Sequence, residues 1–91
     1  MITAIMLLQT ERIKVNSIAE KLTDIKGVNE VYSVSGRYDL IAIVRVKNIE
    51  GVSEIVTNHI LKVEGIIKSE TLVSFRVFSP HDLDGMFGDM D

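Results

Sequence analysis

Hydrophobic positions in the first half of the chain follow the period of a strand, then of a helix, then of two strands. The short apolar run Ile2–Leu8 predicts a strand. Over residues 15–25 apolar side chains recur every three or four positions, which predicts a helix that stops at Gly27. The segments Val28–Ser35 and Tyr38–Lys47 predict two strands, and their close spacing favours an antiparallel hairpin.

The second half repeats the helix-to-strand pattern. Asn48 is suited to cap a helix whose apolar stripe runs over residues 49–63 and ends at Gly65. A last strand is expected within Ile66–Phe78, strongest from Thr71 to Phe78. The order strand, helix, strand, strand, helix, strand predicts an α+β fold. It is a ferredoxin-like βαββαβ sandwich with a four-stranded antiparallel sheet and two helices on one face.

Both faces of the predicted sheet carry apolar side chains. An antiparallel sheet with one face in water would alternate between apolar and polar positions. Instead, each of two strands has apolar residues on both sides: Ala4, Met6 and Leu8 against Ile5 and Leu7, and Leu40, Ala42 and Val44 against Ile41 and Ile43. The hydrophobic fraction of 46% is also high for 91 residues, since a small domain has much surface. We therefore expect a second copy to cover the second face in a sheet-to-sheet dimer.

The length predicts one domain over residues 1–78 and a C-terminal tail over residues 79–91. In the tail, Ser79 and Pro80 suit the start of a short helix. Two interpretations of the tail stay open. It is either a frayed end or a short arm that docks on a neighbouring subunit.

Composition excludes several classes of function. The net charge is −3 and no basic cluster occurs, which argues against direct nucleic-acid binding. Without cysteine there is no disulfide and no cysteine-ligated zinc. His59 and His81 have no ligand partner nearby in the sequence, so we expect neither a metal nor a cofactor. The first apolar run is too short for a membrane span and lacks a signal peptide's basic region, so we expect a cytoplasmic protein.

The segment from Ser35 to Leu40 carries the candidate chemistry. As a plain hairpin turn, it would use Gly36 for a positive φ and Asp39 to cap backbone amides. As a ligand loop, it would offer backbone amides and Arg37 to a carboxylate, the ring of Tyr38 as a wall, and Asp39 to an ammonium group. These are the groups needed to hold a zwitterion.

Three motifs resemble the effector-binding domain of the Lrp/AsnC regulators, also called the RAM domain. They are Leu22-x-x-Ile25-x-Gly27-Val28, Val34-Ser35-Gly36-Arg37-Tyr38-Asp39 and Val63-Glu64-Gly65-Ile66-x-x-Ser69-Glu70-Thr71. The resemblance covers roughly residues 2–78. The G-x-Y-D element lies between the second and third predicted strands, and the S-x-T element opens the last one.

The resemblance implies a βαββαβ domain that dimerises through its sheets and assembles into octamers or similar rings. Effector amino acids bind at contacts between dimers in this family. By similarity, Gly36, Arg37, Tyr38 and Asp39 form one wall of that pocket, and the hydroxyls of Ser69 and Thr71 come from the other side.

Full-length family members carry an N-terminal helix-turn-helix domain, whereas the first strand here begins at Met1 or Ile2. The chain therefore resembles the stand-alone RAM proteins, which would act through a full-length Lrp/AsnC-type regulator or as independent sensors. Two alternatives remain open. One is a purely structural assembly domain, and the other is a small enzyme of the dimeric α+β barrel type, such as a monooxygenase.

Overall fold

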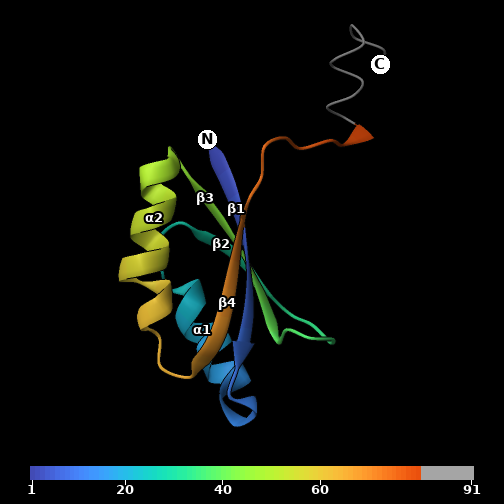
Figure 1. Ribbon diagram of the computed structural model, residues 1–91, viewed down its shortest axis with the longest axis vertical. Helices are drawn as coiled ribbons and strands as arrows, with labels where there is room; N and C mark the ends of the chain where they lie inside the picture. Colours follow the sequence, from blue (N-terminus) through green and yellow to red (C-terminus); the bar gives the residue numbers. More distant parts are fainter. Residues whose placement is uncertain (81–91) are drawn as a thin grey trace, which may run out of the picture.

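The computed structural model describes residues 1–80 (Figure 1). They form one four-stranded antiparallel sheet in the order β2-β3-β1-β4. The strands are β1 (Ile2–Thr10), β2 (Val28–Ser33), β3 (Leu40–Val46) and β4 (Ile66–Val73). The predicted order of elements and the α+β class are confirmed.

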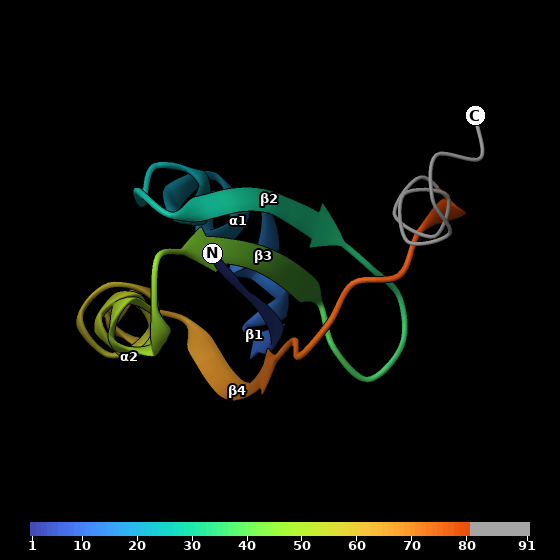
Figure 2. The same cartoon turned by 90° about the horizontal axis from the view of Figure 1, so that it is seen from above.

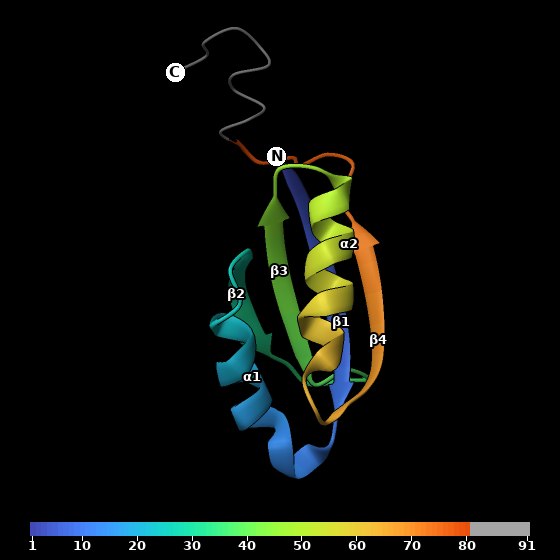
Figure 3. The same cartoon turned by 90° about the vertical axis from the view of Figure 1, so that its left-hand side faces the viewer.

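Two α-helices lie on one face of the sheet, as Figure 3 shows. They are α1 (Val15–Thr23), which follows the short 3-10 helix η1 (Arg12–Lys14), and α2 (Ile49–Asn58), which precedes the 3-10 helix η2 (Ile60–Lys62). The predicted cap of α2 is confirmed, because Asn48 Oδ1 accepts a hydrogen bond from the amide of Gly51 at 2.8 Å. Within residues 1–80 no helix has the length and apolar character needed to cross a membrane.

The core lies between the sheet and the helices. Alternate residues of β1 and β3 face the helices and are fully buried, as the sequence pattern predicted. The helices contribute the apolar stripe that meets them. The buried hydrophobic residues are Ala4, Met6, Leu8, Ile18, Leu22, Leu40, Ala42, Val44, Val52, Ile55 and Ile60.

The opposite side of the sheet, here called the free face, is covered by no helix of residues 1–80 (Figure 2). Strand pairing sets Leu7 beside Ile41 and Ile5 beside Ile43 at its centre. Tyr32 and Leu72 flank them and are 48% and 44% exposed. An apolar band therefore crosses the free face of the single chain.

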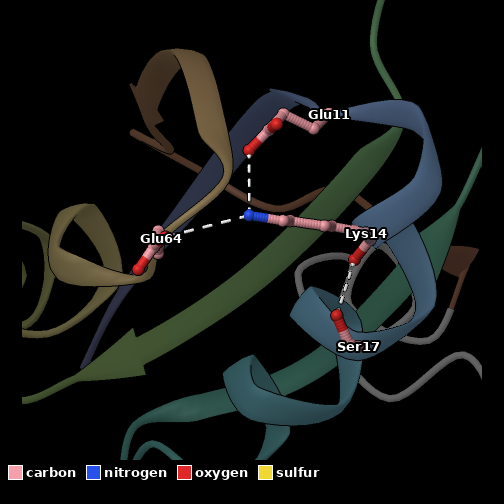
Figure 4. Close-up of polar contacts among 4 residues, drawn as sticks. All are labelled: Glu11, Lys14, Ser17 and Glu64. Atoms are coloured by element: carbon pink, nitrogen blue, oxygen red, sulfur yellow. Dashed lines mark hydrogen bonds and ion pairs between the residues drawn. The ribbon is translucent and has the colours of Figure 1, made fainter.

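The helix-to-strand joint before β4 is fastened to η1 (Figure 4). The amide of Glu11 donates to the carbonyl of Gly65 at 2.9 Å. The ammonium group of Lys14 lies 3.2 Å from the carboxylate of Glu11 and 3.8 Å from that of Glu64. These ion pairs are exposed, so their contribution to stability is small.

The last strand is shorter than predicted. We expected its strongest part over residues 71–78, but β4 ends at Val73. The reason is that β4 pairs with β1 alone within residues 1–80, and β1 begins at Ile2. The amide of Ser74 still donates to the carbonyl of Thr3 at 2.8 Å, and residues 75–79 belong to no strand. The predicted start of a tail helix extends past residue 80, outside the described residues.

Candidate functional site

The loop over residues 34–39 joins β2 to β3 and projects away from the helices (Figure 1). Asp39 makes two contacts with the end of β1 and one within the loop. Its amide donates to the carbonyl of Leu8 at 2.8 Å, and its carbonyl accepts from the amide of Val34 at 3.0 Å. Its carboxylate oxygen Oδ2 accepts from the amide of Thr10 at 2.8 Å. Asp39 therefore holds the loop in place, and one of its carboxylate oxygens is already engaged.

Gly36 stands at the turn of this loop with a φ of +120°. This conformation favours glycine, because a side chain would be strained there. A Cβ atom at this position would meet no atom within 4 Å. Open space therefore lies beside the backbone of Gly36.

Tyr38 reaches from the loop to the edge strand β4. Its hydroxyl donates to Oε1 of Glu70 at 2.7 Å. This hydrogen bond is the main cause that raises the pKa of Tyr38 above 10.0, and desolvation and the charge of Glu70 add to it. The nearby Arg37 acts in the opposite direction. The loop and β4 therefore share one polar site.

These side chains border a polar hollow of about 510 Å³. From β1 and β4 it includes Gln9 and Lys68, which are direct partners across the two strands. Glu70 lies on the same side of β4, two residues further on. The full lining, here called the polar hollow, is Gln9, Gly36, Arg37, Tyr38, Lys68 and Glu70.

The sequence interpretation named the loop but missed three residues of this lining. Gln9, Lys68 and Glu70 lie in strands far from the loop in sequence. The alternation of side chains along a strand could have placed Lys68 and Glu70 on one face of β4. No signal in the sequence gave the register that sets Lys68 opposite Gln9.

Ser69 and Thr71 lie on the other face of β4. They pair with Leu8 and Met6 of β1, whose side chains point into the core. Thr71 borders a separate groove against α2. Within one chain the structure does not bring these two hydroxyls together with the loop. Their expected place, across a contact between dimers, stays a prediction.

A second hollow of about 560 Å³ lies between α2 and the end of β3. It contains an exposed pair in which His59 Nε2 lies 3.2 Å from Glu54 Oε1. None of the predicted ligand residues borders it. Of the predicted ligand residues, Gly36, Arg37 and Tyr38 border the polar hollow instead.

Comparison with known proteins finds relatives among transcriptional regulators. A relative, an uncharacterized HTH-type transcriptional regulator of Pyrococcus abyssi, is 38% identical over 58 residues. The match covers 64% of this chain and 39% of that protein, so this chain spans well under half the length of its relative.

Solved structures share the fold. A protein of Thermus thermophilus has a TM-score of 0.82 and 42% identity, over 87% of this chain and 99% of that one. The feast or famine regulatory protein of M. tuberculosis, complexed with L-methionine, has a TM-score of 0.73 over 87% of this chain and 53% of that one. Its identity is 16%, so this second likeness concerns the fold alone.

The sequence model of one family, described as the Lrp/AsnC ligand binding domain, matches residues 3–83. The match spans both helices, all four strands and the 34–39 loop. The chain therefore belongs to the family of Lrp/AsnC ligand binding domains.

Proposed function

We propose that this chain is an amino-acid-binding, oligomeric sensor domain of the Lrp/AsnC type, and that the polar hollow is part of its ligand site. The observation that carries the proposal is that the 34–39 loop and strand β4 border the same hollow. The open backbone of Gly36, the cation of Arg37 and the hydrogen-bonded pair of Tyr38 and Glu70 border one hollow. Such a set matches the charges of a zwitterion.

The α-carboxylate of the ligand would bind to the amide of Gly36 and to Arg37, with Tyr38 as a wall. Asp39 would keep the loop in this conformation through its contact with Thr10. The hydroxyls of Ser69 and Thr71 would come from a neighbouring dimer. The methionine complex of the M. tuberculosis regulator supports an amino acid as the class of ligand.

The free face supports a sheet-to-sheet dimer. Burial of each Ile or Leu side chain contributes roughly 1.5–3 kcal/mol, so the central band would stabilise a dimer beyond the cost of association. Beyond β4, Phe75, Val77 and Phe78 are also exposed, in a segment that projects on the side of the free face (Figure 2). Such dimers would assemble further into octamers or similar rings.

We also propose that this domain does not bind DNA by itself and works through a full-length regulator or as an independent sensor. The net charge of −3 supports this, because phosphate contacts need clustered cations. The test is an electrophoretic mobility shift with promoter fragments. Retardation by the purified chain alone would contradict this part of the proposal.

A purely structural assembly domain is the second candidate. It is favoured by the fact that Asp39 and Tyr38 already have partners in the same chain, so the loop needs no ligand to satisfy them. An enzyme is no longer a candidate, because the family consists of non-enzymatic ligand-binding domains of transcriptional regulators.

Thermal unfolding across a panel of amino acids separates these two candidates. A ligand at about 100 times its dissociation constant adds roughly 2.7 kcal/mol of stability. For a domain of this size, the midpoint should rise on the order of 10 °C. A rise with a subset of amino acids supports the sensor function. No rise with any of them supports the assembly domain.

A further inference from the structure

Charge is unevenly distributed in the polar hollow. Its lining holds two cations, Arg37 and Lys68, and one carboxylate, Glu70. Within residues 1–80 neither cationic side chain makes an ion pair or a hydrogen bond. The hollow thus has an excess of one positive charge on a chain whose net charge is −3. An unpaired local excess of this kind favours an anionic ligand.

The carboxylates near the loop have different tasks. Asp39 lies outside the lining of the hollow, and its Oδ2 is bonded to the amide of Thr10. Glu70 borders the hollow, and only its Oε1 is engaged, by the hydroxyl of Tyr38. Among residues 1–80, no hydrogen bond engages Glu70 Oε2. Glu70 is therefore better placed than Asp39 to accept a hydrogen bond from an ammonium group.

We propose that the polar hollow selects an amino acid with an acidic side chain. Arg37 and the amide of Gly36 bind the α-carboxylate, Glu70 binds the ammonium group, and Lys68 with Gln9 binds the side-chain carboxylate. The two cations and Glu70 then meet three ligand charges of opposite sign, and the filled site is neutral. This inference rests on the proposed function, because it names the class of ligand for the same site.

Other classes of amino acid fit the charges less well. A basic side chain would bring a third cation beside Arg37 and Lys68, and like charges at close range are unfavourable. An apolar side chain would displace the water that hydrates the Lys68 ammonium group and would offer no hydrogen-bond acceptor in its place. Discrimination against both classes therefore follows from Lys68, an exposed residue on the edge strand β4 whose side chain makes no ion pair or hydrogen bond within residues 1–80.

The first experiment is isothermal titration calorimetry of the full chain with L-glutamate, L-aspartate, L-methionine and L-lysine. The wild-type protein should bind an acidic amino acid at least about 10-fold more tightly than L-methionine, and L-lysine most weakly. In Lys68→Gln the acidic amino acid should lose about 10- to 100-fold in affinity, and L-methionine should change little. Lys21→Gln, on the exposed surface of α1, is the matched control and should leave all affinities unchanged.

The second experiment tests Glu70. In Glu70→Gln, L-glutamate should bind about 10-fold more weakly, whereas N-acetyl-L-glutamate, which has no ammonium group, should not be weakened. Preference for L-methionine or L-lysine, or an affinity for glutamate that Lys68→Gln leaves unchanged, would overturn the inference and leave the sensor function intact. Absence of binding by every amino acid would overturn both.

Discussion

The carboxylate of Asp39 accepts a hydrogen bond from the amide of Thr10 at 2.8 Å, and this bond ties the 34–39 loop to the end of β1. It occurs where the pairing of β1 with β4 changes register, between Gln9 and Thr10. The amide of Thr10 is satisfied by a side chain at this irregular point of the strand. Asp39, the acidic residue of the G-x-Y-D motif, therefore stabilises the loop even without a ligand.

Asp39→Ala should lower the free energy of unfolding by about 1 to 3 kcal/mol, because a hydrogen bond to a charged acceptor is lost at a partly buried amide. Asp39→Asn retains an acceptor oxygen and should lose less. Urea unfolding measures both, with the exposed Asp24→Ala as the control. Equal stability of Asp39→Ala and the wild type would contradict the structural role.

Tyr38 should titrate above its ordinary pKa of 10.0, because Glu70 accepts the hydrogen bond of the neutral phenol. Ultraviolet absorbance of phenolate can follow Tyr38 alone in a Tyr32→Phe variant, since the chain has two tyrosines. Adding Glu70→Gln should bring the pKa back towards 10.0. If Glu70→Gln leaves the pKa of Tyr38 unchanged, the hydrogen bond between Tyr38 and Glu70 is contradicted.

The same contact has a consequence for stability at high pH. A pKa that is higher in the folded state means that the neutral phenol is favoured by folding. The stabilisation is complete below pH 10.0 and is lost as the pH rises through the folded-state pKa. From about pH 9 to about pH 11, the free energy of unfolding should therefore fall more in the wild-type protein than in Tyr38→Phe.

The fold could be predicted from sequence because its elements are locally encoded. The periods of apolar residues, the Asn48 cap and the two glycine joints each predict an element or its end. The end of β4 could not be predicted in this way. The apolar alternation continues to Phe78, but a strand also needs a partner, and β1 offers none beyond Ile2.

The site was predictable only in part, for a similar reason. The loop residues Gly36 to Asp39 are contiguous, so one motif indicates them together. Lys68 and Glu70 join them only through the pairing of β4 with β1, which depends on packing and not on local pattern. Ser69 and Thr71 were named from the motif, and alternation turns them to the opposite face.

Thr10→Val should raise the stability of the domain by about 1 kcal/mol. The side chain of Thr10 is 5% exposed, and its hydroxyl has no hydrogen-bond partner among residues 1–80. A methyl group of similar size would remove that unsatisfied group without leaving a cavity. Thermal and urea unfolding both test this. Destabilisation by Thr10→Val would indicate that the hydroxyl has a partner in solution.

Two glycines with positive φ should differ in their response to alanine. At Gly36 only the backbone strain counts, so Gly36→Ala should lose about 1–2 kcal/mol. At Gly65 a Cβ would also lie 2.8 Å from Ile18 Cδ1 and 3.1 Å from Lys14 Cδ, which adds roughly 1–3 kcal/mol of overpacking. In urea unfolding, Gly65→Ala should therefore be less stable than Gly36→Ala.

The free face gives the last prediction. Ile43 lies at its centre beside Ile5, so Ile43→Lys places a charge in the middle of the proposed dimer contact. The wild-type protein should sediment as a dimer or a larger ring, and Ile43→Lys should shift it towards the monomer. Ile13→Lys is the matched control, because Ile13 is 94% exposed on η1, away from the sheet.

Sedimentation velocity at several protein concentrations, with circular dichroism to verify folding, separates the outcomes. Ile43 faces away from the core between sheet and helices, so a folded monomer is the expected product. A monomeric wild-type protein would remove the sheet-to-sheet dimer from the proposal. If Ile13→Lys dissociates the assembly and Ile43→Lys does not, the contact involves the end of the molecule near η1, and the free face then needs a different partner to cover its apolar band.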